Sequence, residues 1–88
     1  MYSYLVEFLG TAFFVYIILA TGNPIAIGAA LALVYLITNP ISGGHINPAV
    51  TIALVSANQL EVKHLVPYCL AQVFGALVAL ELYKRYQL

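Results

Sequence analysis

Three long apolar stretches with few polar interruptions dominate the pattern along the 88-residue chain. They cover about residues 4–21, 24–40 and 65–83, and a turn signal at 21–24 separates the first from the second. About 20 predominantly apolar residues are enough for a helix that crosses the hydrocarbon core of a bilayer. The pattern therefore predicts an all-α membrane protein, with three transmembrane helices in a single domain over residues 1–88.

A shorter apolar segment, at about residues 41–58, lies between the second and third stretches. Residues 40–46 include two glycines and suit non-helical backbone, which is tolerated at membrane depth only inside protein or beside a wet cavity. Asn47 is a good helix N-cap and Pro48 suits the first helical position, so a helix over 49–57 can begin abruptly. About ten helical residues cover ~15 Å, which is half of a ~30 Å hydrocarbon core.

The segment therefore predicts a re-entrant loop followed by a half-helix. The amino-terminal end of a helix carries partial positive charge, and a half-helix that places this end near the membrane midplane is suited to handling polar solutes. Transport is thus the first functional hypothesis.

The composition agrees with a multi-pass integral membrane protein. Hydrophobic residues make up 64% of the chain and charged residues 7%, with a mean hydropathy of +0.99. Soluble domains typically carry about 25% charged residues. The net charge is zero and no basic patch is present, so we expect no nucleic-acid partner. The sequence contains no nucleophile–base pair and no cluster with metal-ligand spacing, so we expect neither an enzyme nor a bound cofactor or metal.

The few positive charges divide almost evenly between the two sides of the predicted membrane protein. Three spans place the amino terminus, Lys63 and His64 on one side and Lys84 and Arg85 on the other. The Lys/Arg bias that sets orientation is therefore nearly absent. Two explanations stay open: a small protein has few charges in any case, or copies of the chain insert both ways and pair head to tail.

The decapeptide over residues 42–51, Ser-Gly-Gly-His-Ile-Asn-Pro-Ala-Val-Thr, resembles the first-repeat signature of the aquaporin and glycerol-facilitator family, the major intrinsic proteins. Shorter motifs of the same family follow its order and spacing. They are Glu7-Phe8-Leu9-Gly10-Thr11, Ile27-Gly28 and Ala71-Gln72-x-x-Gly75-Ala76. The chief departure is length, because family members carry two such repeats and this chain shows one.

The resemblance implies a passive channel for water and small neutral solutes such as glycerol. One repeat cannot enclose a pore, so we expect inverted copies to pair in the lipid bilayer and rebuild the arrangement of inverted repeats. The family's tetramers suggest a ring of four such dimers. Two alternatives stay open: a non-conducting membrane partner that modulates a full-length channel, and an inactive truncated remnant.

The resemblance also implies which residues meet the solute. Asn47, with Pro48 and Ala49, would present its amide to a single file of water, and backbone carbonyls of residues 42–46, including Gly43 and Gly44, would form a polar ladder. For His45 a structural role, hydrogen-bonded to loop backbone, is favoured over solute contact.

The selectivity filter departs from the family pattern. In the family, an arginine directly follows the second Asn-Pro-Ala, whereas here Val50 follows Ala49. Ile27, just before Gly28, stands at the position of the second helix that is usually aromatic. We therefore expect a wider and less polar pore.

A second set of residues is expected to support the loop. Glu7 is the one ionisable group well inside a predicted span, and the resemblance suggests that it accepts backbone N–H bonds from the loop with help from Gln72. Gly10, Gly28 and Gly75 are expected at close helix crossings.

Overall fold

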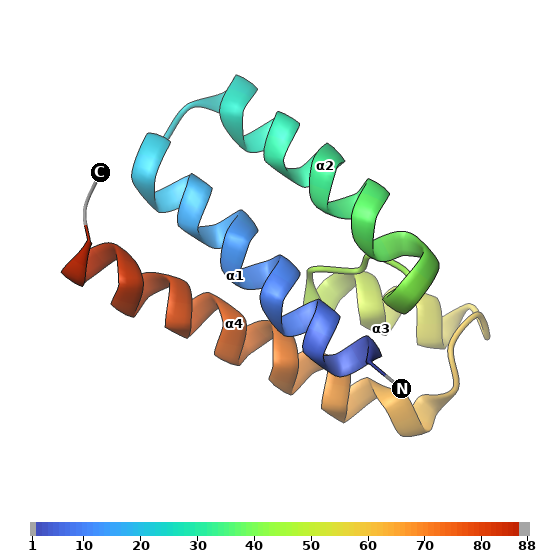
Figure 1. Ribbon diagram of the computed structural model, residues 1–88. Helices are drawn as coiled ribbons and strands as arrows, with labels where there is room; N and C mark the ends of the chain where they lie inside the picture. The colour runs from blue at the N-terminus through green and yellow to red at the C-terminus, as the bar shows by residue number, and fades with distance from the viewer. Residues whose placement is uncertain (1, 87–88) are drawn as a thin grey trace.

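The computed structural model describes residues 2–86, and this part of the chain is built from helices and connecting loops. The helices are α1 (Ser3–Thr21), α2 (Pro24–Ser42), α3 (Pro48–Ser56) and α4 (Leu65–Arg85), with a 3-10 turn, η1 (Val62–His64), before α4 (Figure 1). Three helical segments are long and apolar enough to cross a membrane: α1, α2 and the continuous stretch Val62–Arg85. The all-α membrane fold predicted from the sequence is confirmed.

The long helices lie side by side, with α1 between α2 and α4 (Figure 1). The short helix α3 turns back and packs against the first half of α4, and it contacts α2 far less. The ends of the described chain lie at opposite ends of this bundle, which is 40 Å long. One face of the molecule, between α2 and α3, is therefore left open.

Two Asn-Pro pairs start helices in the same way. The side-chain oxygen of Asn23 accepts the backbone N–H groups of Ile25 and Ala26 at 2.9 and 3.0 Å and caps α2. The side-chain oxygen of Asn47 accepts the N–H of Ala49 at 2.7 Å and caps α3. In each case a proline occupies the first helical turn, where a missing N–H costs nothing.

The second helix is longer than the sequence pattern predicts. We expected non-helical backbone from residue 40, but α2 continues through Pro40 to Ser42. A proline removes one backbone donor, and the helix tolerates this loss near its end. The helix stops instead at Gly43, whose φ of 92° is left-handed and whose N–H bonds the carbonyl of Asn39 at 3.1 Å. The re-entrant loop is thus shorter, at 43–47.

The helix α2 buries only one narrow stripe. Its buried residues, Ala30, Val34, Thr38 and Ser42, recur every four positions and lie on one face. Most of its large apolar side chains are exposed in the single chain. In a membrane these faces meet lipid or another protein, so α2 is the helix of this chain that is least covered by its own fold.

The glycines differ in what they allow. A Cβ at Gly75 would lie 2.5 Å from the carbonyl oxygen of Phe8, and one at Gly10 would lie 2.8 Å from Ile46 Cδ1. Both positions thus permit close packing, Gly75 between α4 and α1 and Gly10 beneath the loop. The helix crossing expected at Gly28 is wrong for the single chain, because no atom lies within 4 Å of a Cβ placed there. Gly28 faces the open side of α2 instead.

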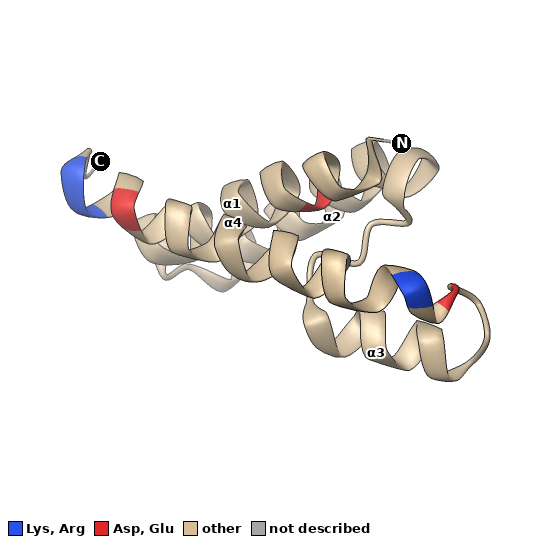
Figure 2. Cartoon of the chain, turned by 90° about the horizontal axis from the view of Figure 1, so that it is seen from below, with Lys and Arg blue, Asp and Glu red and all other residues tan. Residues whose placement is uncertain are grey.

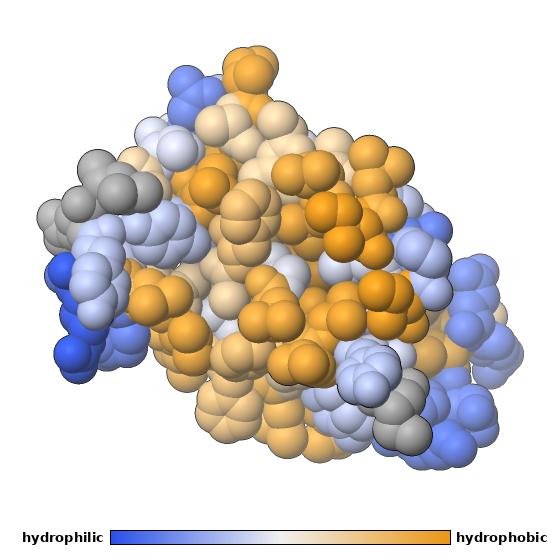
Figure 3. Space-filling view, in the orientation of Figure 1, coloured by the Kyte–Doolittle hydropathy of each residue, from blue (hydrophilic) through white to orange (hydrophobic). Residues whose placement is uncertain are grey.

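The Lys and Arg positions lie at the two ends of the bundle, each close to an acidic position, and one further acidic position lies on α1 between them (Figure 2). Lys63 pairs with Glu61 at 3.8 Å at one end, and Arg85 pairs with Glu81 at 3.9 Å at the other. An apolar belt covers the face between the hydrophilic ends (Figure 3). This distribution is typical of a protein that spans a bilayer.

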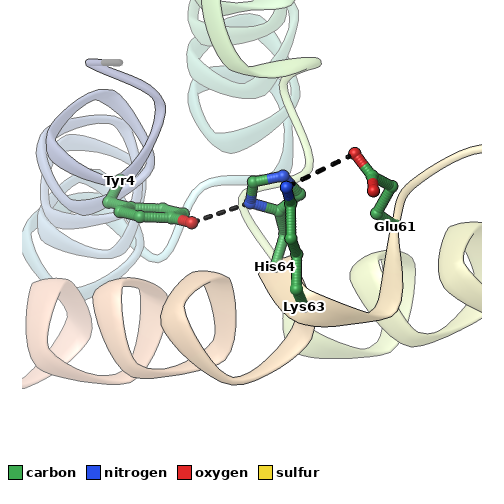
Figure 4. A network of polar contacts seen from close by, with 4 residues as sticks. All are labelled: Tyr4, Glu61, Lys63 and His64. Atoms are coloured by element: carbon green, nitrogen blue, oxygen red, sulfur yellow. Dashed lines mark hydrogen bonds and ion pairs between the residues drawn. The ribbon is translucent and has the colours of Figure 1, made fainter.

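A tyrosine–histidine contact joins the beginnings of α1 and α4. The hydroxyl of Tyr4 lies 2.7 Å from Nδ1 of His64, beside the Lys63–Glu61 pair (Figure 4). The Tyr4 ring also meets Tyr68 edge-on at 5.6 Å between centroids. These contacts hold the beginnings of α1 and α4 together at the end of the bundle where the loop after α3 leads into α4.

Candidate functional site

The carboxylate of Glu7 anchors the re-entrant loop, and Glu7 is fully buried, with 0% of its surface exposed. One carboxylate oxygen accepts the backbone N–H of Ile46 at 2.8 Å, and the other accepts that of His45 at 3.1 Å. The Ser42 hydroxyl and the Gln72 amide donate two further bonds, at 2.6 and 2.9 Å. A buried carboxylate is tolerated when its lone pairs are occupied by such donors. Glu7 thus joins α1, the end of α2, the loop and α4.

Thr51 on α3 extends this polar network. Its hydroxyl, on a residue that is 0% exposed, accepts the Gln72 amide at 2.8 Å and lies 2.9 Å from Nδ1 of His45. The side-chain NH2 group of Gln72 therefore donates to both Glu7 and Thr51. The negative charge of the Glu7 carboxylate favours this orientation of the amide, with its NH2 group toward Glu7. Gln72 Oε1 is buried without a hydrogen-bond partner among the described residues.

His45 is buried, but its partner differs from the expected one. Its ring contacts the Thr51 side chain rather than loop backbone. The ring also packs against Tyr68 at 4.8 Å between centroids, and the Tyr68 hydroxyl donates to the carbonyl of Ser42 at 2.8 Å. Sequence reasoning missed both Thr51 and Tyr68. Thr51 ends the decapeptide motif and could have been found there, whereas an isolated tyrosine in an apolar helix gives no signal.

The loop backbone is left-handed at three positions. Gly43 and Gly44 have φ of 92° and 64°, and Ile46 has φ of 59°. For a β-branched residue such as Ile46 this conformation is strained, at a cost of about 1–3 kcal/mol. The bond from its N–H to Glu7 and the burial of its side chain against Gly10 offset that strain. The anchor and the loop conformation are therefore interdependent.

Several polar groups of the loop remain free. Among residues 2–86, the side-chain NH2 group of Asn47 has no hydrogen-bond partner, because only the side-chain oxygen takes part in the cap of α3. Of the carbonyls expected to form a polar ladder over 42–46, that of Ser42 accepts from the Tyr68 hydroxyl, and that of Ile46 lies 3.5 Å from the Thr11 hydroxyl. Within that described range, the carbonyls of residues 43–45 accept no hydrogen bond.

An open groove of about 470 Å³ lies on the uncovered face of α2, with Gly44 and His45 of the loop in its lining. The groove brings together Gly44, His45 and Val50, three residues expected at the pore, with Gly28. Asn47, Pro48 and Ala49 lie in the segment between His45 and Val50 and do not themselves line the groove; Asn47 and Ala49 are exposed. Ile27 is partly exposed and does not line the groove; its neighbour Gly28 does.

Sequence reasoning missed three groove residues on α2: Leu31, Ala32 and Tyr35. They stand three, four and seven positions after Gly28, so all four residues share one helix face. That spacing could have revealed them once Gly28 was assigned to the open side. The groove has one wall only, with polar loop atoms and apolar helix side chains, and none of residues 2–86 covers it.

Curated relatives match the chain over most of its length. It is 39% identical to Glycerol uptake facilitator protein-like 6 of Lactiplantibacillus plantarum, over 90% of this chain and 41% of that protein. It is 37% identical to Aquaporin-8 of Notomys alexis, over 90% of this chain and 34% of that protein. A 43% identity to Aquaporin Z of Brucella melitensis covers 66% of this chain and 25% of the relative. The chain thus spans less than half the length of these relatives.

No solved structure matches the chain. The profile of the family described as Major intrinsic protein matches residues 1–87, which is nearly the entire sequence. This match covers the loop anchored by Glu7, the Asn-Pro-Ala start of α3 and all three membrane-spanning helices. The chain therefore belongs to the major intrinsic protein family.

Proposed function

We propose that this chain forms a passive channel for water and small neutral solutes by pairing of inverted copies in the membrane. The observation that carries the proposal is the one-walled groove, in which the loop residues Gly44 and His45 lie beside apolar side chains of α2. Their carbonyls accept no hydrogen bond among residues 2–86, and the exposed Asn47 lies in the adjoining segment. A second copy, related by a two-fold axis in the membrane plane, would supply the missing wall. The names of the relatives, aquaporin and glycerol uptake facilitator, support the solute class.

The free polar groups suit a single file of neutral molecules. The Asn47 side-chain oxygen accepts the Ala49 N–H, so the NH2 group of the same amide points away from the cap. This NH2 group can donate a hydrogen bond to the oxygen of a passing solute molecule. The loop carbonyls accept hydrogen bonds from the same molecule. Two α3 amino-terminal ends near the midplane add positive potential and disfavour hydronium and other cations.

Pairing in opposite orientations fits the energetics of a single copy in lipid. Asn47 is exposed in the single chain. Each loop carbonyl that faced hydrocarbon without a hydrogen-bond partner would cost roughly several kcal/mol. The balanced charges at the two ends of the bundle favour neither orientation strongly. Four such dimers in a ring would follow the family's tetramers.

The proposed pore admits more than water. Val50 lines the groove, and a pore made only of this repeat has no arginine in the place after Asn-Pro-Ala. With Ile27 in the position of the family's aromatic residue, that level is apolar and wide. Glycerol and similar neutral solutes are therefore proposed as cargo beside water.

Reconstitution of the purified chain alone tests the proposal. Stopped-flow light scattering would follow vesicle volume under osmotic and glycerol gradients. We expect fast volume change with the wild-type chain and a fall to the level of empty vesicles with Asn47→Phe. The substitution removes the proposed solute donor and places a bulky ring at the exposed start of α3, in the segment between the groove residues His45 and Val50.

Asn23→Phe is the matched control. It also removes the cap of a helix that begins with Asn-Pro, but Asn23 lies in the α1–α2 connection and not in the segment between the groove residues His45 and Val50. It should retain most of the flux. Folded wild-type protein whose vesicles are no leakier than empty lipid would contradict the channel and favour a non-conducting partner of a larger protein.

A further inference from the structure

Tyr35 is a groove residue that the family motifs do not include. It lies on the face of α2 shared by Gly28, Leu31 and Ala32 and lines the groove with the loop and Val50. The hydroxyls of Tyr4, Tyr16 and Tyr68 each make a hydrogen bond. Among the residues that the structure describes, the Tyr35 hydroxyl makes none, and the residue is 49% exposed.

The ring of Tyr35 lies against the loop backbone. A Cβ placed on Gly44 would come within 2.8 Å of its Cδ1 and 3.3 Å of its Cε1. The loop therefore leaves the ring no room to withdraw in that direction, and the open space lies on the groove side. The ring thus stands beside Gly44 of the re-entrant loop.

Tyr35 is also the bulkiest side chain on the α2 wall of the groove. The other α2 residues there are Gly28, Leu31 and Ala32. Tyr35 stands seven residues after Gly28, which is about 10 Å further along the helix. The narrowing by its ring is therefore well separated from the level of Ile27 and Gly28, where the pore is expected to be wide.

We infer that the Tyr35 ring sets the width of the pore at the level of the re-entrant loop, and so limits the size of the neutral solutes that pass. This inference rests on the proposed channel function. In an inverted pair each copy contributes one Tyr35, so the pore has two equivalent narrow points, one in each half. The limit acts through the bulk of the ring, and the hydroxyl is not required for it.

Three variants of the full chain, reconstituted alone, test this inference. Permeability to water, to glycerol and to a four-carbon polyol would be measured for Tyr35→Ala, Tyr35→Phe and Leu36→Ala. Leu36 adjoins Tyr35, is 73% exposed and does not line the groove, so its truncation controls for loss of side-chain volume on α2. Retained water flux and helical circular dichroism would establish that each variant is folded.

We expect Tyr35→Ala to raise the polyol-to-water permeability ratio several-fold, most for the larger polyol, and Tyr35→Phe and Leu36→Ala to keep the wild-type ratio. An unchanged ratio in Tyr35→Ala, with a conducting wild-type chain, overturns the role of Tyr35 and leaves the channel standing. A Tyr35→Phe variant that behaves like Tyr35→Ala also overturns it, because the ring would not be the limit. A wild-type chain that conducts nothing overturns the channel and this inference together.

Discussion

At the scale of single residues, the site depends on one buried carboxylate. Glu7 accepts hydrogen bonds from Ser42, His45, Ile46 and Gln72 and holds the strained backbone of the loop in place. The residues that would meet solute, by contrast, are those whose polar atoms stay unpaired. Support and proposed conduction are therefore carried by different residues, and substitutions should separate them.

Replacing Glu7 by glutamine tests the supporting role. The amide keeps the size of the side chain but brings its own donors toward groups that already donate, so at least one buried bond is lost. We expect the free energy of unfolding to fall by roughly 1–3 kcal/mol for each group left unpaired. Unfolding in SDS–detergent mixtures, followed by circular dichroism, would measure this.

Glu61→Gln is the matched control for this change. Glu61 is exposed, and its pair with Lys63 spans 3.8 Å at the end of the bundle, so the change should stay within about 0.5 kcal/mol. Equal stability of the Glu7 and Glu61 variants would show that the buried bonds to Glu7 do not hold the fold.

At the scale of elements, α1 and α4 cross closely at Gly75. Gly75 lets the backbone of α4 approach Phe8, and its buried neighbours Gln72 and Ala79 lie on the same helix face. The position of Gln72 beside Glu7 follows from this close approach. A wider crossing would pull the amide away from the loop anchor.

Gly75→Ala should therefore lower stability although alanine is the better helix former. Its Cβ would meet the Phe8 carbonyl at 2.5 Å, and overpacking of this kind costs about 1–3 kcal/mol. Gly28→Ala, where no atom lies within 4 Å, should be neutral or stabilising in the same SDS unfolding assay. The opposite order of the two variants would contradict the described packing.

The elements themselves are largely predictable from the sequence, because length, apolar content and Asn-Pro caps are local signals. The faces of the helices are not. In α2 nearly every side chain is apolar, so periodicity cannot tell the stripe that packs on α1 from the stripe that lines the groove. The pattern therefore predicts a helix crossing at Gly28, where the single chain has open space, and it does not single out Tyr35. The end of α2 was placed too early because a proline signals a break, whereas the left-handed Gly43 provides it.

At the scale of the whole molecule, the single chain leaves one side of its groove open, and the proposed pathway requires a partner there. The motif predicted the loop and its anchor, since both lie in residues that the family resemblance covers. What the sequence could not provide is the partner that closes the groove, because the exposed apolar faces of α2 suit lipid and protein equally. Only the orientation of the copies relative to one another distinguishes an inverted pair from a heteromeric partner.

The most direct measurement is therefore flux through copies whose orientation is fixed. Glu81→Lys gives an excess of two Lys/Arg residues at one end of the bundle, and joint replacement of the exposed Ala57, Gln59 and Glu61 by lysine gives the same excess at the other. Positive charge retained on the cytoplasmic side should insert the two forms in opposite orientations. Labelling with an impermeant amine reagent would verify this in membrane vesicles.

We expect vesicles that contain either form alone to show no water flux above the background of empty vesicles, and vesicles from cells that express both forms to recover the wild-type rate. Wild-type flux from one form alone, with a single orientation verified, would contradict the inverted pair.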